Sequence, residues 1–143
     1  MKMLKHKFVD KIPEDIEEGV LYVSIPYEIV IHKCCCGCGN EVVTPISPTD
    51  WAITFNGESI TLNPSIGNWS LDCRSHYFIR KNKVVWSTSY SDEEISEVRK
   101  VDSEDKYEYF QKMEKGKDLV SKEVGKAEDK KSFWRRLFSK LLK

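Results

Sequence analysis

The run Cys34-Cys35-Cys36-Gly37-Cys38-Gly39 carries four of the five cysteines in the sequence, and Cys73 follows at a distance. The N-terminus lacks the apolar run of an export signal, so the expected compartment is the reducing cytoplasm, where clustered cysteines are thiolates rather than disulfides. The two glycines allow the backbone to turn tightly enough to direct several thiolates at one point. This pattern predicts a bound metal ion, and zinc is the expected one.

The spacing of the cysteines also indicates which of them bind the metal. Side chains of adjacent residues diverge, whereas side chains two positions apart point the same way. The predicted ligands are Cys34, Cys36, Cys38 and Cys73, a set that suits a closed structural zinc site. His76, in Cys73-x-x-His76, is the rival fourth ligand. Buried free thiols and an iron–sulfur cluster are the alternative interpretations of the run.

Composition limits the class of protein. Hydrophobic residues make up 40% of the 143-residue chain and are concentrated before Trp86. The charge-rich remainder leaves a packed domain of about 90 residues, a size at which a bound metal helps stability. The 23 basic and 23 acidic residues balance, so there is no overall electrostatic reason to bind nucleic acid. No apolar run is long enough to cross a membrane.

Short segments rich in β-branched and aromatic residues predict a mainly β fold. The predicted strands are residues 7–9, 21–25, 28–32, 51–55, 58–62, 77–79 and 84–86. Asn56-Gly57 and Lys81-Asn82-Lys83 are predicted hairpin turns, whereas the prolines in residues 44–49 predict an irregular loop. The expected fold is a small zinc-stapled antiparallel β domain with hairpins, followed by a charged helical tail.

The chain is predicted to divide into three parts. Residues 1–90 form the zinc-binding β domain, residues 91–129 a polar helical segment or linker, and residues 130–143 a basic amphipathic helix. Ser91-Asp92-Glu93-Glu94 has the form of a capping box, which predicts a helix start. On a helix, the apolar residues of the last part fall on one half: Phe133, Trp134, Leu137, Phe138, Leu141 and Leu142. That half could pack on the domain's own core, bind a partner's groove or lie on an anionic membrane surface.

Ser65, His76 and Ser75 are the candidates for catalysis. Ser65 lies in a predicted turn at residues 64–69, and His76 could serve as its general base. Ser75 and His76 are neighbours on a segment expected to be extended, so their side chains point to opposite faces and make a poor pair. The spacing alone is equally compatible with a turn-capping Ser65 and a structural or metal-binding His76.

The stretch from Phe8 to Trp86 resembles a bacterial domain-of-unknown-function family whose genes neighbour those of ubiquitin-like conjugation systems. The pattern Cys-x-Cys-Gly-Cys-Gly, Pro-Ser-Ile-Gly and Cys-x-Ser-His-Tyr occurs here at residues 34–39, 64–67 and 73–77. The resemblance implies serine-type processing or deconjugation of a ubiquitin-like protein. It does not choose among Ser65, Ser75 and Ser47 as the nucleophile.

Two functional hypotheses follow. The first is a zinc-stabilised serine-type peptidase that processes or removes a ubiquitin-like modifier, with Ser65 as nucleophile, His76 as base and Ser75 as the alternative nucleophile. The second is a non-catalytic zinc-binding adaptor of a ubiquitin-like conjugation system. Under both hypotheses the expected partners are a ubiquitin-like protein or conjugation enzymes.

Overall fold

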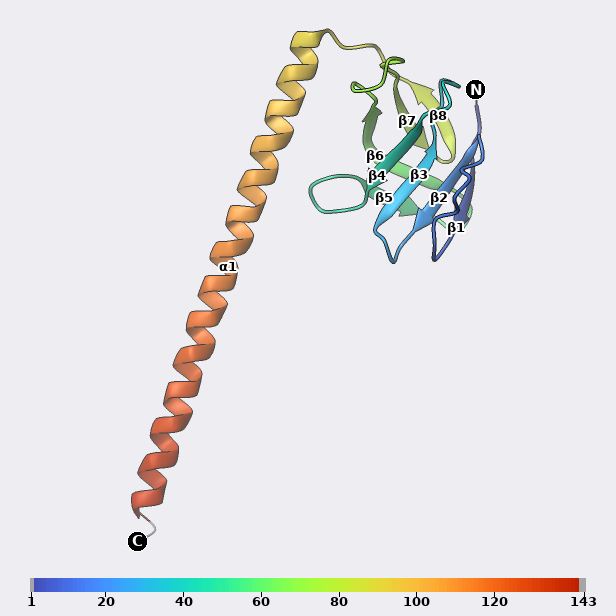
Figure 1. Cartoon of the computed structure of the whole chain (residues 1–143). Coiled ribbons are helices and arrows are strands. Elements are labelled where there is room, and N and C mark those ends of the chain that lie inside the picture. Colours follow the sequence, from blue (N-terminus) through green and yellow to red (C-terminus); the bar gives the residue numbers. More distant parts are fainter. Residues whose placement is uncertain (1, 142–143) are drawn as a thin grey trace. The chain divides into compact units, whose positions relative to one another are not determined.

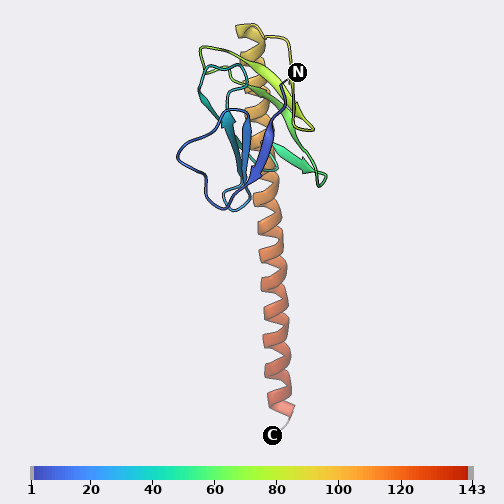
Figure 2. The same cartoon turned by 90° about the vertical axis from the view of Figure 1, so that its right-hand side faces the viewer.

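The computed structural model describes the backbone of residues 2–141 and the side chains of residues 2–117. The chain forms two compact units, Met1–Val98 and Arg99–Lys143. All the strands of the described residues lie in the first unit (Figures 1 and 2), which confirms the mainly β fold. They are β1 (Lys5–Phe8), β2 (Val20–Ser24), β3 (Ile29–Lys33), β4 (Glu41–Pro45), β5 (Ala52–Phe55), β6 (Ile60–Gly67), β7 (His76–Arg80) and β8 (Lys83–Trp86).

The strands form two four-stranded sheets, ordered β1-β2-β3-β4 and β5-β6-β7-β8. Neighbouring strands are antiparallel, with the exception of β1, which pairs with β2 in parallel. This pair departs from the expected all-antiparallel domain. The long connection of residues 9–19 explains it, because parallel neighbours need a crossover rather than a tight turn.

One hydrophobic core joins the two sheets. The first sheet contributes Leu21, Val23, Val30 and Val42, and the second contributes Ile60, Leu62, Ile66, Tyr77, Ile79 and Val84. Burying an aliphatic side chain of this size stabilises a fold by roughly 1.5–3 kcal/mol. Cys34 and Cys35 belong to the same core, so the cysteine run is anchored in the packed interior. A smaller cluster on the outer face of β2 packs Val20 and Tyr22 against Ile16 and Ile31.

Both predicted hairpins are present. In the turn between β7 and β8, Lys81 and Asn82 have φ angles of 50° and 62°, as a tight two-residue turn requires. The turn between β5 and β6 is longer than the Asn-Gly pair suggests, and Gly57 is its residue with positive φ, at 92°. Here the Asn56 side chain holds the turn, because its Oδ1 accepts the N–H groups of Glu58 and Ser59 at 3.1 and 2.8 Å.

Two segments predicted to be irregular are strands. β4 occupies part of the expected loop of residues 44–49, with Pro45 paired opposite Ile29. Proline is tolerated there because β4 is an edge strand and Pro45 is its last residue. Ser65, expected in a turn, lies within β6, where the register against β7 shifts between Leu62 and Ile66. At this bulge the backbone around Ser65 differs from that of a regularly paired strand.

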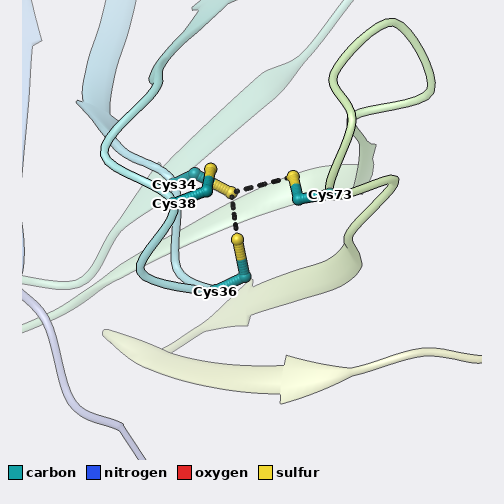
Figure 3. A group of neighbouring side chains, drawn as sticks. All are labelled: Cys34, Cys36, Cys38 and Cys73. Atoms are coloured by element: carbon teal, nitrogen blue, oxygen red, sulfur yellow. Dashed lines mark hydrogen bonds between the residues drawn. The ribbon is translucent and has the colours of Figure 1, made fainter.

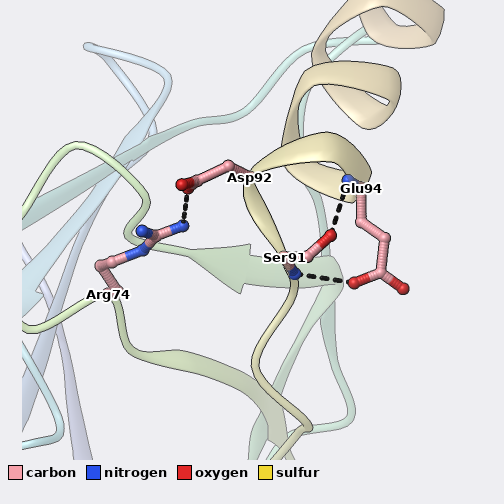
Figure 4. A network of polar contacts seen from close by, with 4 residues as sticks. All are labelled: Arg74, Ser91, Asp92 and Glu94. Carbon is pink, nitrogen blue, oxygen red and sulfur yellow. Dashed lines mark hydrogen bonds and ion pairs between the residues drawn. The ribbon is translucent and has the colours of Figure 1, made fainter.

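Helix α1 (Asp92–Leu141) runs through both the predicted helical segment or linker and the predicted basic helix. The capping box forms as predicted (Figure 4): the Ser91 N–H donates to Glu94 Oε2, and the Glu94 N–H donates to Ser91 Oγ. The apolar side chains assigned to residues 130–143 lie outside the described side chains. Within the described residues, no helix combines the length and apolarity needed to cross a membrane.

Candidate functional site

Four of the five cysteines converge at one end of the β unit. Cys34, Cys36 and Cys38 come from the turn after β3, and Cys73 comes from the loop before β7 (Figure 3). Their Sγ atoms all lie within 4.8 Å of one another. We call this group the four-cysteine cluster. It is the set that the sequence predicted.

The spacing of the sulfurs fits a tetrahedral metal ion. Cys34 Sγ lies 3.4 Å from Cys36 Sγ and 3.9 Å from Cys73 Sγ. Zinc–sulfur bonds of about 2.3 Å in a tetrahedron require sulfur–sulfur separations of roughly 3.8 Å. The turn supports this convergence, because Gly37 and Gly39 adopt φ angles of 87° and 80°. The four-cysteine cluster could therefore hold one metal ion.

The pKa values of two thiols in the four-cysteine cluster are shifted in opposite directions. N–H donors of the Asn40 backbone and side chain lower the pKa of Cys38 to about 6. Desolvation, ahead of the neighbouring sulfurs, raises the pKa of Cys36 to about 12, although this residue is exposed. Four thiolates so close together would repel one another, a cost that a bound cation would remove.

Cys35 stands apart from the four-cysteine cluster. Its side chain is buried in the hydrophobic core, and desolvation raises the pKa of its thiol to about 11. Cys35 is thus a neutral core residue, as its position in the run suggested. His76, the rival ligand, is engaged elsewhere.

The imidazole of His76 contacts the hydroxyl of Ser65. Nε2 of His76 lies 2.9 Å from Ser65 Oγ, and Nδ1 lies 2.8 Å from the backbone carbonyl oxygen of Thr88. A carbonyl oxygen can only accept a hydrogen bond, so Nδ1 carries the proton. Nε2 is then the lone-pair nitrogen and accepts the Ser65 hydroxyl. This tautomer is the one that a general base needs in order to activate a serine.

An aromatic wall, formed by Trp69 and Tyr90, packs against His76, a residue that is only 4% exposed. The rings of Trp69 and Tyr90 each lie with their centres 4.8 Å from that of His76, and they stack on each other at 5.3 Å. On the serine side, the Trp51 indole N–H donates to the Ser65 carbonyl oxygen at 3.3 Å. Neither Tyr90 nor the Thr88 carbonyl could be identified from the sequence, since both depend on where the chain passes after β8.

Ser75 faces the four-cysteine cluster. Its Oγ lies 3.1 Å from Cys34 Sγ and accepts the Asn68 side-chain N–H at 2.8 Å. Ser75 and Asn68 are 7% and 8% exposed. Ser65 and Ser75 therefore have different surroundings. The Ser65 hydroxyl contacts an imidazole, whereas the Ser75 hydroxyl contacts sulfur and amide groups.

His32 is a buried structural residue. Its Nε2 lies 2.9 Å from the Tyr77 hydroxyl, and desolvation lowers the pKa of His32 to about 4. The same loss of solvent raises the pKa of the Tyr77 hydroxyl. Both groups are therefore neutral near pH 7, and this pair belongs to the polar interior next to Asn68.

Comparison with known protein families identifies one that matches this chain. The family BubE, described as a bacterial ubiquitination-like system serine protease, matches residues 8–87. The chain belongs to this family. The BubE match includes both the four-cysteine cluster and the Ser65–His76 pair, and it ends before α1. No curated protein and no solved structure matches the chain.

Proposed function

We propose that this chain is a serine-type peptidase that processes or removes a bacterial ubiquitin-like modifier, stabilised by one zinc ion. The observation that carries the proposal is the 2.9 Å contact between Ser65 Oγ and His76 Nε2, with Nδ1 held by the Thr88 carbonyl. Membership of the BubE family supports the reaction class and the ubiquitination-like context. The ubiquitin-like protein, with its conjugation enzymes in the cytoplasm, is the expected partner.

The geometry supports assigned roles in acyl transfer. Ser65 Oγ attacks the carbonyl carbon of the scissile bond while His76 Nε2 takes its proton. The same proton then passes from His76 to the leaving amine, and an acyl group remains on Ser65. Water, deprotonated by His76, attacks that ester, releases the carboxylate product and restores the serine. The carbonyl of Thr88 keeps the ring orientation and the tautomer fixed through these steps.

Ser65 is favoured over Ser75 as the nucleophile on its surroundings. The Ser75 hydroxyl contacts Cys34 Sγ, which is a proposed metal ligand, and the Asn68 amide, which is not a base. Ser75 is also buried beside the four-cysteine cluster. Ser47, the third serine that the resemblance left open, donates its hydroxyl to Asp50 Oδ2 at 2.6 Å. The Thr49 N–H also donates to Ser47 Oγ. The Ser47 hydroxyl therefore takes part in hydrogen bonds that close a turn, and the carboxylate belongs to that turn.

The proposed metal role is structural. Four thiolates fill a tetrahedral zinc ion and leave no open position for water or substrate. When bound, the metal would hold the turn after β3 to the loop before β7. Cys34, Cys36, Cys38 and Cys73 are the proposed ligands.

The test is cleavage of a ubiquitin-like precursor by the wild type and by Ser65→Ala, His76→Ala and Ser75→Ala. Ser65→Ala removes the nucleophile and should lose nearly all activity. Loss of a general base typically costs a factor of about 10²–10⁴, so His76→Ala should also lose nearly all activity. A serine-reactive fluorophosphonate should label the wild type and not Ser65→Ala. Undiminished cleavage by both Ser65→Ala and His76→Ala would rule out this nucleophile and base. Absence of cleavage and of probe labelling in the wild type would instead leave the non-catalytic adaptor hypothesis.

A further inference from the structure

The loop of residues 68–75 connects the two groups described above. It begins directly after β6, which carries Ser65, and it ends at β7, which starts with His76. Along the way it contributes Cys73 to the four-cysteine cluster and Trp69 to the wall around His76. A single short segment therefore contacts both the metal-binding sulfurs and the proposed base.

Asn68 is the residue at which these contacts meet. Its side-chain amide donates to Ser75 Oγ at 2.8 Å and lies 3.5 Å from Cys34 Sγ and 3.4 Å from the Tyr77 hydroxyl. Its backbone N–H donates to the Ser75 carbonyl at 2.9 Å, and its carbonyl accepts the Leu71 N–H at 3.1 Å. The residue is thus fixed through both its main chain and its side chain.

The position of Asn68 in the sequence transmits this constraint. Trp69 follows it immediately, and the Trp69 ring lies close to both His76 and Gly67. Ser75, the other end of the bridge, immediately precedes His76. Movement of Asn68 away from Cys34 would therefore displace Trp69, and movement of Ser75 would displace the backbone that leads into His76.

We propose that Asn68 and Ser75 are positioning residues that tie the four-cysteine cluster to the Ser65–His76 pair. The expected effect on cleavage rests on the proposed peptidase function. The expected effect on the position of His76 rests on geometry alone. Under this proposal, the metal site supports cleavage by fixing the loop that bears Trp69, without contact with the substrate. A buried amide that hydrogen-bonds both a metal-ligand sulfur and a hydroxyl is suited to such a role, because its loss leaves several polar groups unpaired.

Nuclear magnetic resonance of the histidine ring protons tests the structural part. The His76 ring lies against two aromatic rings, so its carbon-bound protons should be shifted by their ring currents, and the His76→Gln spectrum identifies them. In zinc-loaded Asn68→Ala, and less strongly in Ser75→Ala, these signals should move toward the positions of an exposed histidine. Thr44→Val is the matched control, because this substitution also removes a buried hydrogen bond, from Thr44 to the Val30 carbonyl, in the other sheet. Its His76 signals should stay in place.

Cleavage kinetics test the catalytic part. Misplacement of a reacting group by about 1 Å can cost on the order of 100-fold, so Asn68→Ala should lower kcat by roughly 10- to 100-fold. KM should change little, and Thr44→Val should retain wild-type kcat. Zinc content near one per chain in each variant shows that the metal itself has not been lost.

The outcomes separate the two proposals. Unchanged His76 signals in both Asn68→Ala and Ser75→Ala overturn the positioning role, whatever the activity. Shifted signals with a wild-type kcat overturn its part in catalysis. If the wild type cleaves no precursor and resists the serine-reactive probe, the peptidase function fails, and the His76 signals still decide whether the bridge positions the ring. If Asn68→Ala does not fold, Ser75→Ala supplies the same comparison.

Discussion

The indole ring of Trp69 occupies the space beside Gly67 that a Cβ atom would need. A Cβ built on Gly67 would lie 2.3–2.5 Å from three atoms of that ring. Such an approach is closer than real side-chain contacts, and the ring has little room to retreat because it stacks on Tyr90. Glycine at this position is therefore a requirement of packing.

Gly67→Ala should consequently displace Trp69 from His76. We expect a loss of stability of about 1–3 kcal/mol from overpacking. We also expect cleavage activity to fall at least about tenfold, as the histidine loses the Trp69 ring that packs against it. Denaturant unfolding and precursor cleavage measure the two effects. Gly116→Ala is the control: nothing lies within 4 Å of a Cβ there, and alanine favours the helix by about 1 kcal/mol. Equal behaviour of the two variants would contradict the packing argument.

Cys73 and Cys35 should respond differently to substitution. Cys73→Ser removes one of four proposed ligands, so the purified protein should lose stoichiometric metal and its resistance to heat. Cys35→Ala leaves the four-cysteine cluster intact and should keep one metal ion per chain, at a cost of about 1–2 kcal/mol for the small cavity. Elemental analysis and thermal unfolding with and without a strong chelator give the comparison. Similar metal contents in the two variants would show that the cluster is not the metal site.

Much of the fold and of the four-cysteine cluster could be predicted from local sequence. Alternate spacing in the cysteine run singles out Cys34, Cys36 and Cys38, and the glycines that turn the backbone there, Gly37 and Gly39, lie within the run itself. The turn at Asn82 and the cap at Ser91 were predictable for the same reason. β4 was missed because Pro45 signals irregular structure, and only the sheet order reveals that it lies on an edge.

The surroundings of Ser65 could not be predicted in this way. Ser65 approaches His76 through a shift in register between β6 and β7, and pairing register is a property of the whole sheet. The group that orients His76 is a main-chain carbonyl, that of Thr88, which any residue could supply. A search for a carboxylate partner in the sequence would therefore have found nothing useful.

His32 should make folding stability depend on pH. Desolvation lowers its pKa from 6.5 to about 4 in the folded chain, while the unfolded chain keeps the ordinary value. Below pH 6.5 the unfolded state therefore binds a proton that the folded state excludes. The stabilisation is complete above pH 6.5 and declines as the pH falls toward 4, by at most about 3 kcal/mol in total.

Substitution separates this effect from the release in acid of a metal ion bound at the four-cysteine cluster, as proposed above. His32→Gln can still hydrogen-bond the Tyr77 hydroxyl but does not titrate. The difference in the free energy of unfolding between wild type and His32→Gln should shift against the wild type between pH 6.5 and 4, by up to about 1.4 kcal/mol per pH unit. Chemical denaturation at a series of pH values provides the measurement. Parallel curves for the two proteins would mean that His32 does not titrate differently on unfolding.

Ser91 should stabilise the start of α1 independently of the proposed catalytic pair. Its Oγ accepts the Glu94 N–H at 3.2 Å, and its own N–H donates to Glu94 Oε2 at 2.7 Å. Next to it, Asp92 forms an ion pair with Arg74 (Figure 4), and Ile95 is buried one turn into the helix. Ser91→Ala removes the cap and should cost about 1 kcal/mol in the free energy of unfolding.

Ser96→Ala is the matched control, because Ser96 is exposed within the helix, where alanine is the better helix former. This variant should be neutral or slightly stabilising. Urea unfolding of both variants, followed by circular dichroism, distinguishes a cap from a surface serine. A loss of the same size in both would show that the Ser91 side chain contributes nothing as a cap. The helix start would then depend on burial of Ile95 and on the Arg74–Asp92 pair.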